Sequence, residues 1–238
     1  MRARLSRAVL ATLLVVSGAQ SGSAQEPKPA PPSNPVGGPA WNNTKVTQEP
    51  QVAGITLDAK QIELVKSISG YFNEFPNLRG AFVQTAPDNK RMRGKFFVKR
   101  PGRLRFEYSL PSKQLIIADG KQLAVQDHDL NTDDRYALDQ TLFRMLLRQD
   151  VDLLRDARIL DVQEADDLLI VSLQDKSPDA PGKIRLFLTK APRLELKEWV
   201  MTDAQGTDTR VELSNLVKTE EIDVGLFKIE SPSLKRVQ

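Results

Sequence analysis

The 238-residue sequence contains no cysteine. This excludes disulfide bonds, a thiol nucleophile and thiolate-bound metal sites. It also has a single histidine, His128, in a polar stretch. A metal site or a histidine-based catalytic site would need further residues that the sequence does not cluster around it. We therefore expect His128 to be a solvated loop residue and the chain to need no metal or other cofactor.

The short motifs that mark common enzymes are missing as well. There is no G-x-S-x-G sequence, no Walker A sequence and no G-x-G-x-x-G sequence. The acidic pairs Asp133-Asp134 and Asp166-Asp167 stand at expected turns, where adjacent side chains diverge, which favours turn formation over acid–base catalysis. The sequence predicts a protein that is not an enzyme. A β-rich hydrolase whose catalytic residues are spread along the chain is the alternative from that class.

No apolar run is long enough to span a membrane. The apolar run Ala8–Val16 follows three arginines and precedes the small, polar stretch Ser17–Ala24. A charged start, a short apolar centre and small residues at a cleavage site are typical of a secretory signal peptide. We expect residues 1–24 to be this peptide, cleaved near Ala24, and the remainder to be a soluble protein of the periplasm. An uncut N-terminal anchor is the alternative.

The basic isoelectric point of about 9.1 comes from this same segment. Removing residues 1–24 takes away three arginines and no acidic residue, so the formal net charge falls from +3 to 3 − 3 = 0. A chain without an overall basic field gives no reason to expect nucleic-acid binding.

Residues 25–55 are rich in proline, glycine, asparagine and glutamine, and they are expected to form a flexible linker. Docking of this proline-rich stretch to a partner is a second interpretation. The folded domain is then predicted to span residues 56–238. It opens with a helix over Asp58–Phe75, where Asp58 and Gln61 form a capping box and Pro76 ends the helix.

From Gly80 onward apolar residues recur at every second position, as in a strand, instead of at the spacing of a helix. Two short and very apolar helical segments, Leu142–Leu147 and Val151–Leu154, interrupt this pattern. About ten or eleven antiparallel strands are expected, which is typical of a sandwich or barrel. The predicted strands are Ala81–Thr85, Met92–Lys99, Arg103–Tyr108, Gln114–Ala118, Gln122–Gln126, Arg158–Gln163, Leu168–Gln174, Lys183–Thr189, Glu195–Thr202, Thr207–Val217 and Leu226–Ile229.

The central stretch, KFFVKRPGRLRFEY over Lys95–Tyr108, contains two strands joined at a Pro-Gly turn. Leu104, Phe106 and Tyr108 share one face, as do Phe96, Val98 and Arg100. The apolar rows and the two short helices either pack together as a simple core or enclose a cavity beneath a helical lid. Arg100 correspondingly either reaches water or lies at the cavity rim, where it would bond to carbonyls at the end of a lid helix.

The same stretch resembles a known family. The block G-x-F-x-V-x-R-P-x-x-x-R-x-x-Y from Gly94 to Tyr108 and the hairpin P-x-x-x-x-I-x-x-D-G from Pro111 to Gly120 are similar to the periplasmic outer-membrane lipoprotein carriers, the LolA-type family. Further matching pieces occur in the family's order. They are L-x-G-x-F-x-Q from Leu78, L-F-x-x-L-L from Leu142, L-x-x-W-x-x-x-D-x-x-G from Leu196 and L-F-x-I-x-x-P from Leu226.

The resemblance implies a mainly β fold, an unclosed antiparallel β-barrel of about 11 strands with a helical lid over an apolar cavity. It implies a carrier that binds the acyl chains of lipoproteins. Because the sequence has no nucleotide-binding motif, a partner would have to supply the energy for loading. Its partners would be acylated lipoprotein cargo, an inner-membrane ATP-driven exporter and an outer-membrane lipoprotein receptor, and we expect a monomer. A periplasmic carrier or sensor of another lipid, such as a glycolipid or hopanoid-like molecule, is the alternative.

The resemblance also assigns residues. It makes Arg100 the latch of the lid. The acyl-chain cavity would be lined by Phe96, Val98, Leu104, Phe106, Tyr108, Phe143, Met145 and Leu146. The long proline-rich segment before the first helix and the short C-terminus after Pro232 depart from the family pattern.

Overall fold

The computed structural model describes residues 54–230. The expected signal peptide, residues 1–24, lies outside the described residues. So does the expected linker, residues 25–55, apart from its last two residues, and so does the end of the expected domain, residues 231–238.

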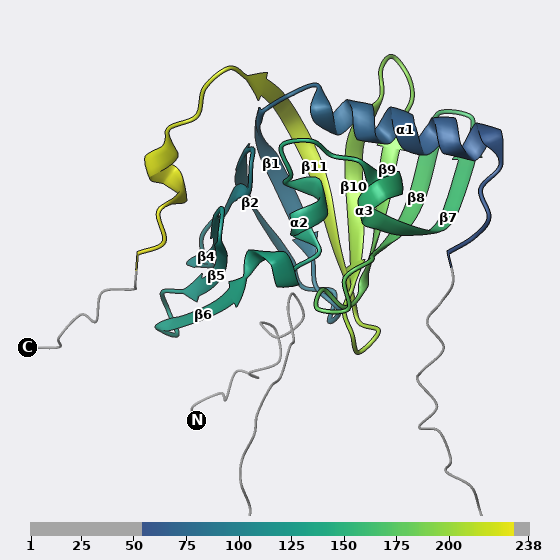
Figure 1. Ribbon diagram of the computed structural model, residues 1–238. Helices are drawn as coiled ribbons and strands as arrows, with labels where there is room; N and C mark the ends of the chain where they lie inside the picture. The colour runs from purple at the N-terminus through teal and green to yellow at the C-terminus, as the bar shows by residue number, and fades with distance from the viewer. Residues whose placement is uncertain (1–53, 231–238) are drawn as a thin grey trace, which may run out of the picture. The chain divides into compact units, whose positions relative to one another are not determined.

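The first helix, α1, spans Ala59–Asn73. The predicted capping box is confirmed, because Asp58 Oδ1 accepts from the Gln61 backbone N–H at 2.8 Å and Gln61 Oε1 accepts from the Asp58 N–H at 3.1 Å. The helix buries one stripe of side chains, including Val65 and Ile68. Figure 1 shows α1 lying across the sheet, over the strands β7 to β9.

The strands form one antiparallel sheet of 11 strands in the order β6-β5-β4-β3-β2-β1-β11-β10-β9-β8-β7. The edge strands β6 and β7 are not paired with each other, so the predicted unclosed barrel is confirmed. The strands are β1 Asn77–Thr85, β2 Arg91–Lys99, β3 Arg103–Tyr108, β4 Gln114–Asp119, β5 Gln122–Asp127, β6 Thr132–Ala137, β7 Ala157–Ala165, β8 Leu168–Asp175, β9 Lys183–Thr189, β10 Glu195–Thr202 and β11 Asp208–Thr219.

Three short helices lie in the connection between the edge strands β6 and β7. The 3-10 helix η2, Leu138–Gln140, leads into α2, Phe143–Leu146, and α3, Leu153–Asp156, follows shortly after. Figure 1 shows α2 and α3 in front of the sheet, on the same side as α1. Because their buried side chains belong to the same apolar cluster as those of α1 and the sheet, these helices cover the concave face. We call the segment from residue 138 to residue 156 the lid.

Two strand predictions differ from the structure. The edge strand β6, with the sequence TDDRYA, was not predicted: none of its residues is fully buried, and its two aspartates, which disfavour strands, were wrongly expected to stand at a turn. The predicted strand Leu226–Ile229 is wrong. A 3-10 helix, η3, spans Val224–Phe227 instead, and the Asp223 side chain accepts from the Gly225 N–H at 2.9 Å to begin it.

The η3 segment packs on the face of the sheet that points away from the lid. Arg105 Nη1 donates to the Leu226 carbonyl at 2.8 Å, and Lys99 Nζ donates to the Ile222 carbonyl at 3.0 Å. Phe227 is fully buried there. The alternation of β3 explains this contact, since Arg105 points opposite to the cavity-facing Leu104 and Phe106.

Candidate functional site

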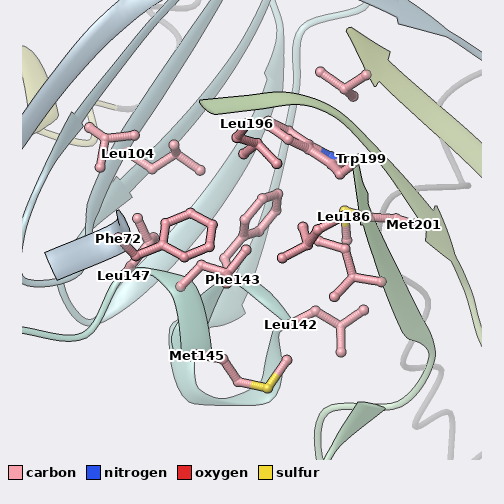
Figure 2. Packing of buried hydrophobic residues seen from close by; sticks show 14 of the residues in the cluster. Phe72, Leu104, Leu142, Phe143, Met145, Leu147, Leu186, Leu196, Trp199 and Met201 are labelled. Carbon is pink, nitrogen blue, oxygen red and sulfur yellow. The ribbon is translucent and has the colours of Figure 1, made fainter. Parts of the chain in front are cut away.

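An apolar cavity of about 60 Å³ lies between the concave face of the sheet, the C-terminal end of α1 and the lid. Figure 2 shows how side chains from these elements converge, with Phe72 from α1, Phe143 and Leu147 from the lid, and Leu196 and Trp199 from β10. The lining residues are Tyr71, Phe72, Phe75, Leu78, Phe96, Val98, Arg100, Leu104, Phe106, Phe143, Leu146, Leu147, Ile184, Leu196, Trp199 and Leu213.

Most of the cavity residues named from the sequence lie in this wall. Six of the eight line it, namely Phe96, Val98, Leu104, Phe106, Phe143 and Leu146. Tyr108 and Met145 are buried but do not line the cavity. The Tyr108 hydroxyl donates to Gln84 Oε1 at 2.5 Å, because β3 continues past the cavity and its last inward side chain meets β1 instead.

Sequence reasoning missed the wall contributed by the second half of the sheet. Ile184, Leu196, Trp199 and Leu213 come from β9 to β11 and close the cavity opposite β2 and β3. An edge-on contact between Phe106 of β3 and Trp199 of β10, at 6.1 Å between ring centroids, connects the two halves.

Arg100, directly after β2, is 8% exposed and lies at the cavity rim. Its Nε donates to the Leu146 carbonyl at 3.0 Å, and its Nη1 donates to the carbonyls of Phe75, at 2.7 Å, and Phe72. The Leu146 carbonyl is at the end of α2, and the other two are at the end of α1. Carbonyls at helix ends have no partner within the helix and carry partial negative charge, so they suit a cation.

The guanidinium of Arg100 therefore ties the end of α1 to the end of the lid helix. Its carbon Cζ also lies 5.0 Å from the ring centroid of Phe75 and 5.6 Å from that of Phe72. Within residues 54–230 no carboxylate forms an ion pair with it. Burial lowers the pKa of Arg100 to about 10, so the side chain is cationic at neutral pH while bonded only to neutral partners.

The turn after Arg100 adds a backbone contact to the lid. The Gly102 N–H donates to the Leu147 carbonyl at 2.8 Å. Gly102 has φ +74, and a Cβ added to it would lie 2.8 Å from the Cα of Gly120. Only glycine fits this conformation and spacing. The glycine of the Pro-Gly turn therefore both forms the turn and, through its N–H, holds the lid.

A second arginine, which sequence reasoning did not identify, holds the other side of the lid. Arg144 of α2 donates from Nε to Asp175 Oδ2 at 2.6 Å and from Nη2 to Asp175 Oδ1 at 2.5 Å. The Asp175 side chain at the end of β8 is 0% exposed and also accepts from the Ser177 N–H at 2.7 Å. This is a two-point, charge-assisted pair between the lid and the sheet.

The connection between α2 and α3 is fixed to α1 by side chains of that helix. The amide of Asn73 makes two hydrogen bonds with the backbone of Val151, each 2.9 Å long, and Ser69 Oγ accepts from the Leu153 N–H at 3.1 Å. Among the side chains that make these attachments to the lid, that of Arg100 lines the cavity, whereas those of Arg144, Asn73 and Ser69 do not.

Within residues 54–230 there is no group of three or more His, Asp or Glu side chains placed to hold a metal ion. None of the described helices is both long and apolar enough to cross a membrane. The cavity wall itself is made almost entirely of hydrocarbon and aromatic side chains, which is the chemistry of an apolar ligand site.

Comparisons with known proteins identify a family that this chain matches. The family described as outer membrane lipoprotein carrier protein LolA matches residues 73–230. The outer-membrane lipoprotein carrier protein of Halorhodospira halophila is 26% identical over 187 residues, covering 75% of this chain and 86% of the relative. That of Alkalilimnicola ehrlichii is 28% identical over 188 residues, covering 73% of this chain and 83% of the relative.

Among solved structures, a LolA superfamily protein from Nitrosomonas europaea is similar to this chain with a TM-score of 0.39 and 16% identity. The match covers 69% of this chain and 97% of that one. Since the family match extends over more than half of the chain, including α1's end, all strands and the lid, this protein belongs to the LolA family of outer membrane lipoprotein carrier proteins.

Proposed function

We propose that the protein is a periplasmic carrier that takes up the acyl chains of lipoproteins released from the inner membrane and delivers them to the outer membrane. The observation that carries this proposal is an apolar cavity covered by a lid whose cavity-side attachment is Arg100. Family and fold are those of carrier proteins rather than enzymes. The two relatives described above are each named outer-membrane lipoprotein carrier protein.

The cavity must enlarge before it can hold such cargo. Pockets for ligands of drug size have volumes of roughly 300–1,000 Å³, whereas this cavity has about 60 Å³. The lid residues Phe143, Leu146 and Leu147 occupy the space between the sheet and α1. An acyl chain that enters has to displace them, and displacing Leu146 breaks its bond with Arg100.

Energetics favour a lid that competes with the cargo. Each buried methylene contributes roughly 0.8 kcal/mol, so two or three acyl chains fully buried would bind almost permanently. Their sum would pass the practical ceiling of about 20 kcal/mol for non-covalent binding. A carrier that hands its cargo on therefore gains from re-forming the three carbonyl bonds of Arg100 as the cargo leaves.

On this proposal the remaining parts of the chain have defined roles. Residues 1–24 direct export and are cleaved near Ala24, residues 25–55 are a linker, and the domain starting at residue 56 is a soluble carrier. An ATP-driven exporter of the inner membrane loads it, since no nucleotide-binding motif occurs in the sequence. An outer-membrane receptor accepts the cargo.

A pull-out experiment tests the proposal. Inner-membrane vesicles containing a triacylated lipoprotein and the exporter are incubated with ATP and the protein lacking residues 1–24. The supernatant is analysed for a one-to-one soluble complex, with a parallel reaction that lacks ATP. The proposal predicts the complex only with ATP.

If the vesicles release their lipoprotein to an established carrier but not to this protein, lipoprotein delivery is contradicted. Mass spectrometry of lipids extracted from the protein purified from its periplasm then identifies the class that it carries instead. A glycolipid or hopanoid-like molecule bound at one per protein would assign the cavity to that cargo.

A further inference from the structure

Trp199 lines the cavity, and its indole N–H has no hydrogen-bond partner among the described residues. Three of the lining side chains carry polar atoms, those of Tyr71, Arg100 and Trp199. Arg100 donates to three carbonyls, and the backbone of Leu196 hydrogen-bonds to the Tyr71 hydroxyl. The Trp199 side chain is buried, with 7% exposure, and its Nε1–H has no hydrogen-bond partner among the described residues.

None of the described residues accepts a hydrogen bond from the Trp199 Nε1–H. On β10 it pairs with Leu186 of β9 and Val211 of β11, and its ring meets Phe106 edge to face. Figure 2 shows it among apolar side chains, including Leu186 and Leu196. A buried donor that stays unpaired is unfavourable, and most such groups in proteins are bonded. A water molecule is a poor substitute here, since a buried water needs two to four polar partners.

We propose that the Trp199 Nε1–H donates a hydrogen bond to a carbonyl oxygen of the bound acyl chain, the ester or amide carbonyl that joins the chain to its cargo. This inference rests on the proposed function as a carrier of acyl chains. It adds that the carbonyl end of a chain enters the cavity together with the hydrocarbon. It also assigns the cavity a preference for acyl esters and amides over alkyl ethers.

The hydrogen bond meets a need of both partners. A carbonyl that moves from water into an apolar cavity loses its hydrogen bonds to water, which is costly unless a donor replaces them. Trp199 is a donor with no acceptor function of its own. Nε and Nη1 of Arg100 already donate to carbonyls of the lid and of the end of α1, whereas the indole N–H has no partner among the described residues, so a carbonyl can bond to it without first breaking another bond.

The test compares two probes that differ only in the carbonyl, palmitoyl lysophosphatidylcholine and its hexadecyl ether analogue. Dissociation constants are measured below the micelle concentration for the protein lacking residues 1–24 and for its Trp199→Phe variant. The ester-to-ether affinity ratio is expected to fall about three- to tenfold in the variant, the range of one lost neutral hydrogen bond. Leu213→Ala, a change in the same wall that removes only hydrocarbon, should weaken both probes by a similar factor and keep the ratio.

Replacement of Trp199 by benzothienylalanine, in a Trp41→Phe background, removes the N–H and keeps the ring shape, so it serves if the phenylalanine variant does not fold. A ratio that stays at the wild-type value in both replacements overturns the role of Trp199 while leaving the carrier function in place. Failure of the wild type to bind either probe contradicts the carrier proposal, and this inference with it.

Discussion

Arg100 and Arg144 both attach the helix α2 to the rest of the molecule, but their partners differ in kind. Arg144 makes a two-point pair with a carboxylate whose side chain is fully buried. Arg100 is itself buried and bonds only to backbone carbonyls. An opposite charge stabilises the first guanidinium strongly, whereas three neutral acceptors offset the burial of the second only in part.

This difference indicates which side of the lid moves. Breaking the Arg144 pair would leave Asp175 as an uncompensated buried charge, which is strongly destabilising. Opening at Arg100 instead gives a buried cation access to water, which returns part of the cost of its burial. We therefore expect the lid to stay attached at Arg144 and to open at the cavity side, where Arg100 and Leu147 are held.

The largest effect on stability is expected from Asp175→Asn. The change removes the charge that pairs with Arg144 and should lower the free energy of unfolding by about 3 kcal/mol, the lower end for a broken buried pair because Arg144 is partly exposed. Urea denaturation measures it. Asp179→Asn, an exposed position four residues away, is the control and should unfold at the wild-type midpoint. An unchanged midpoint for Asp175→Asn would remove the distinction between the two arginines.

Asn73→Ala should have the next largest effect. It removes both hydrogen bonds between α1 and the backbone of Val151, each contributing about 1 kcal/mol, so a loss of about 2 kcal/mol is expected. Glu63→Ala, on the exposed side of the same helix, is the matched control. If Asn73→Ala unfolds like the control, the segment around Val151 is not a fixed attachment of the lid.

Arg100→Leu should have a smaller effect on stability than the two preceding variants, but a large effect on the transfer of cargo. The variant loses three carbonyl bonds but also the burial of a charge, so the free energy of unfolding should fall by about 1 kcal/mol. Cargo should still bind, and its transfer to acceptor vesicles should slow by about tenfold or more, because the closed lid no longer competes with the acyl chain. Transfer of a fluorescent acylated peptide at the wild-type rate would contradict the latch.

The smallest effect is expected from Arg155→Gln. Arg155 lies in the same lid and pairs with Asp150 and Asp156, but its side chain is 45% exposed. Exposed ion pairs contribute little, so neither the urea midpoint nor the transfer rate should change measurably. A transfer defect here as large as that of Arg100→Leu would show that any arginine of the lid affects release.

The repeating elements of the fold could be predicted from the sequence, because each depends on local patterns. Strict alternation identified β2 and β3 and the face of each that is buried. The capping box and Pro76 located α1. The position of Arg100 in the same row as Phe96 and Val98 left water or the cavity rim as its place, and the structure places it at the rim.

Residues that meet only through the curvature of the sheet were not predictable in this way. Trp199 and Leu213 join the wall because β10 and β11 bend toward β3, which no local pattern reports. Tyr108 follows the alternation of β3 but lies beyond the cavity, bonded to Gln84. The pairing of Arg144 with Asp175, 31 residues away, depends on how α2 rests on the sheet.

Hydrogen exchange at two backbone amides tests the account most directly. The Gly102 N–H bonds to Leu147 on the Arg100 side of the lid, and the Ser177 N–H bonds to Asp175 on the Arg144 side. When the protein is loaded with palmitoyl lysophosphatidylcholine, exchange of the Gly102 amide should rise by about tenfold or more, with that of Ser177 unchanged. A loaded protein in which Gly102 keeps its protection, or in which Ser177 loses its own, would contradict a lid that opens at Arg100 and stays attached at Arg144.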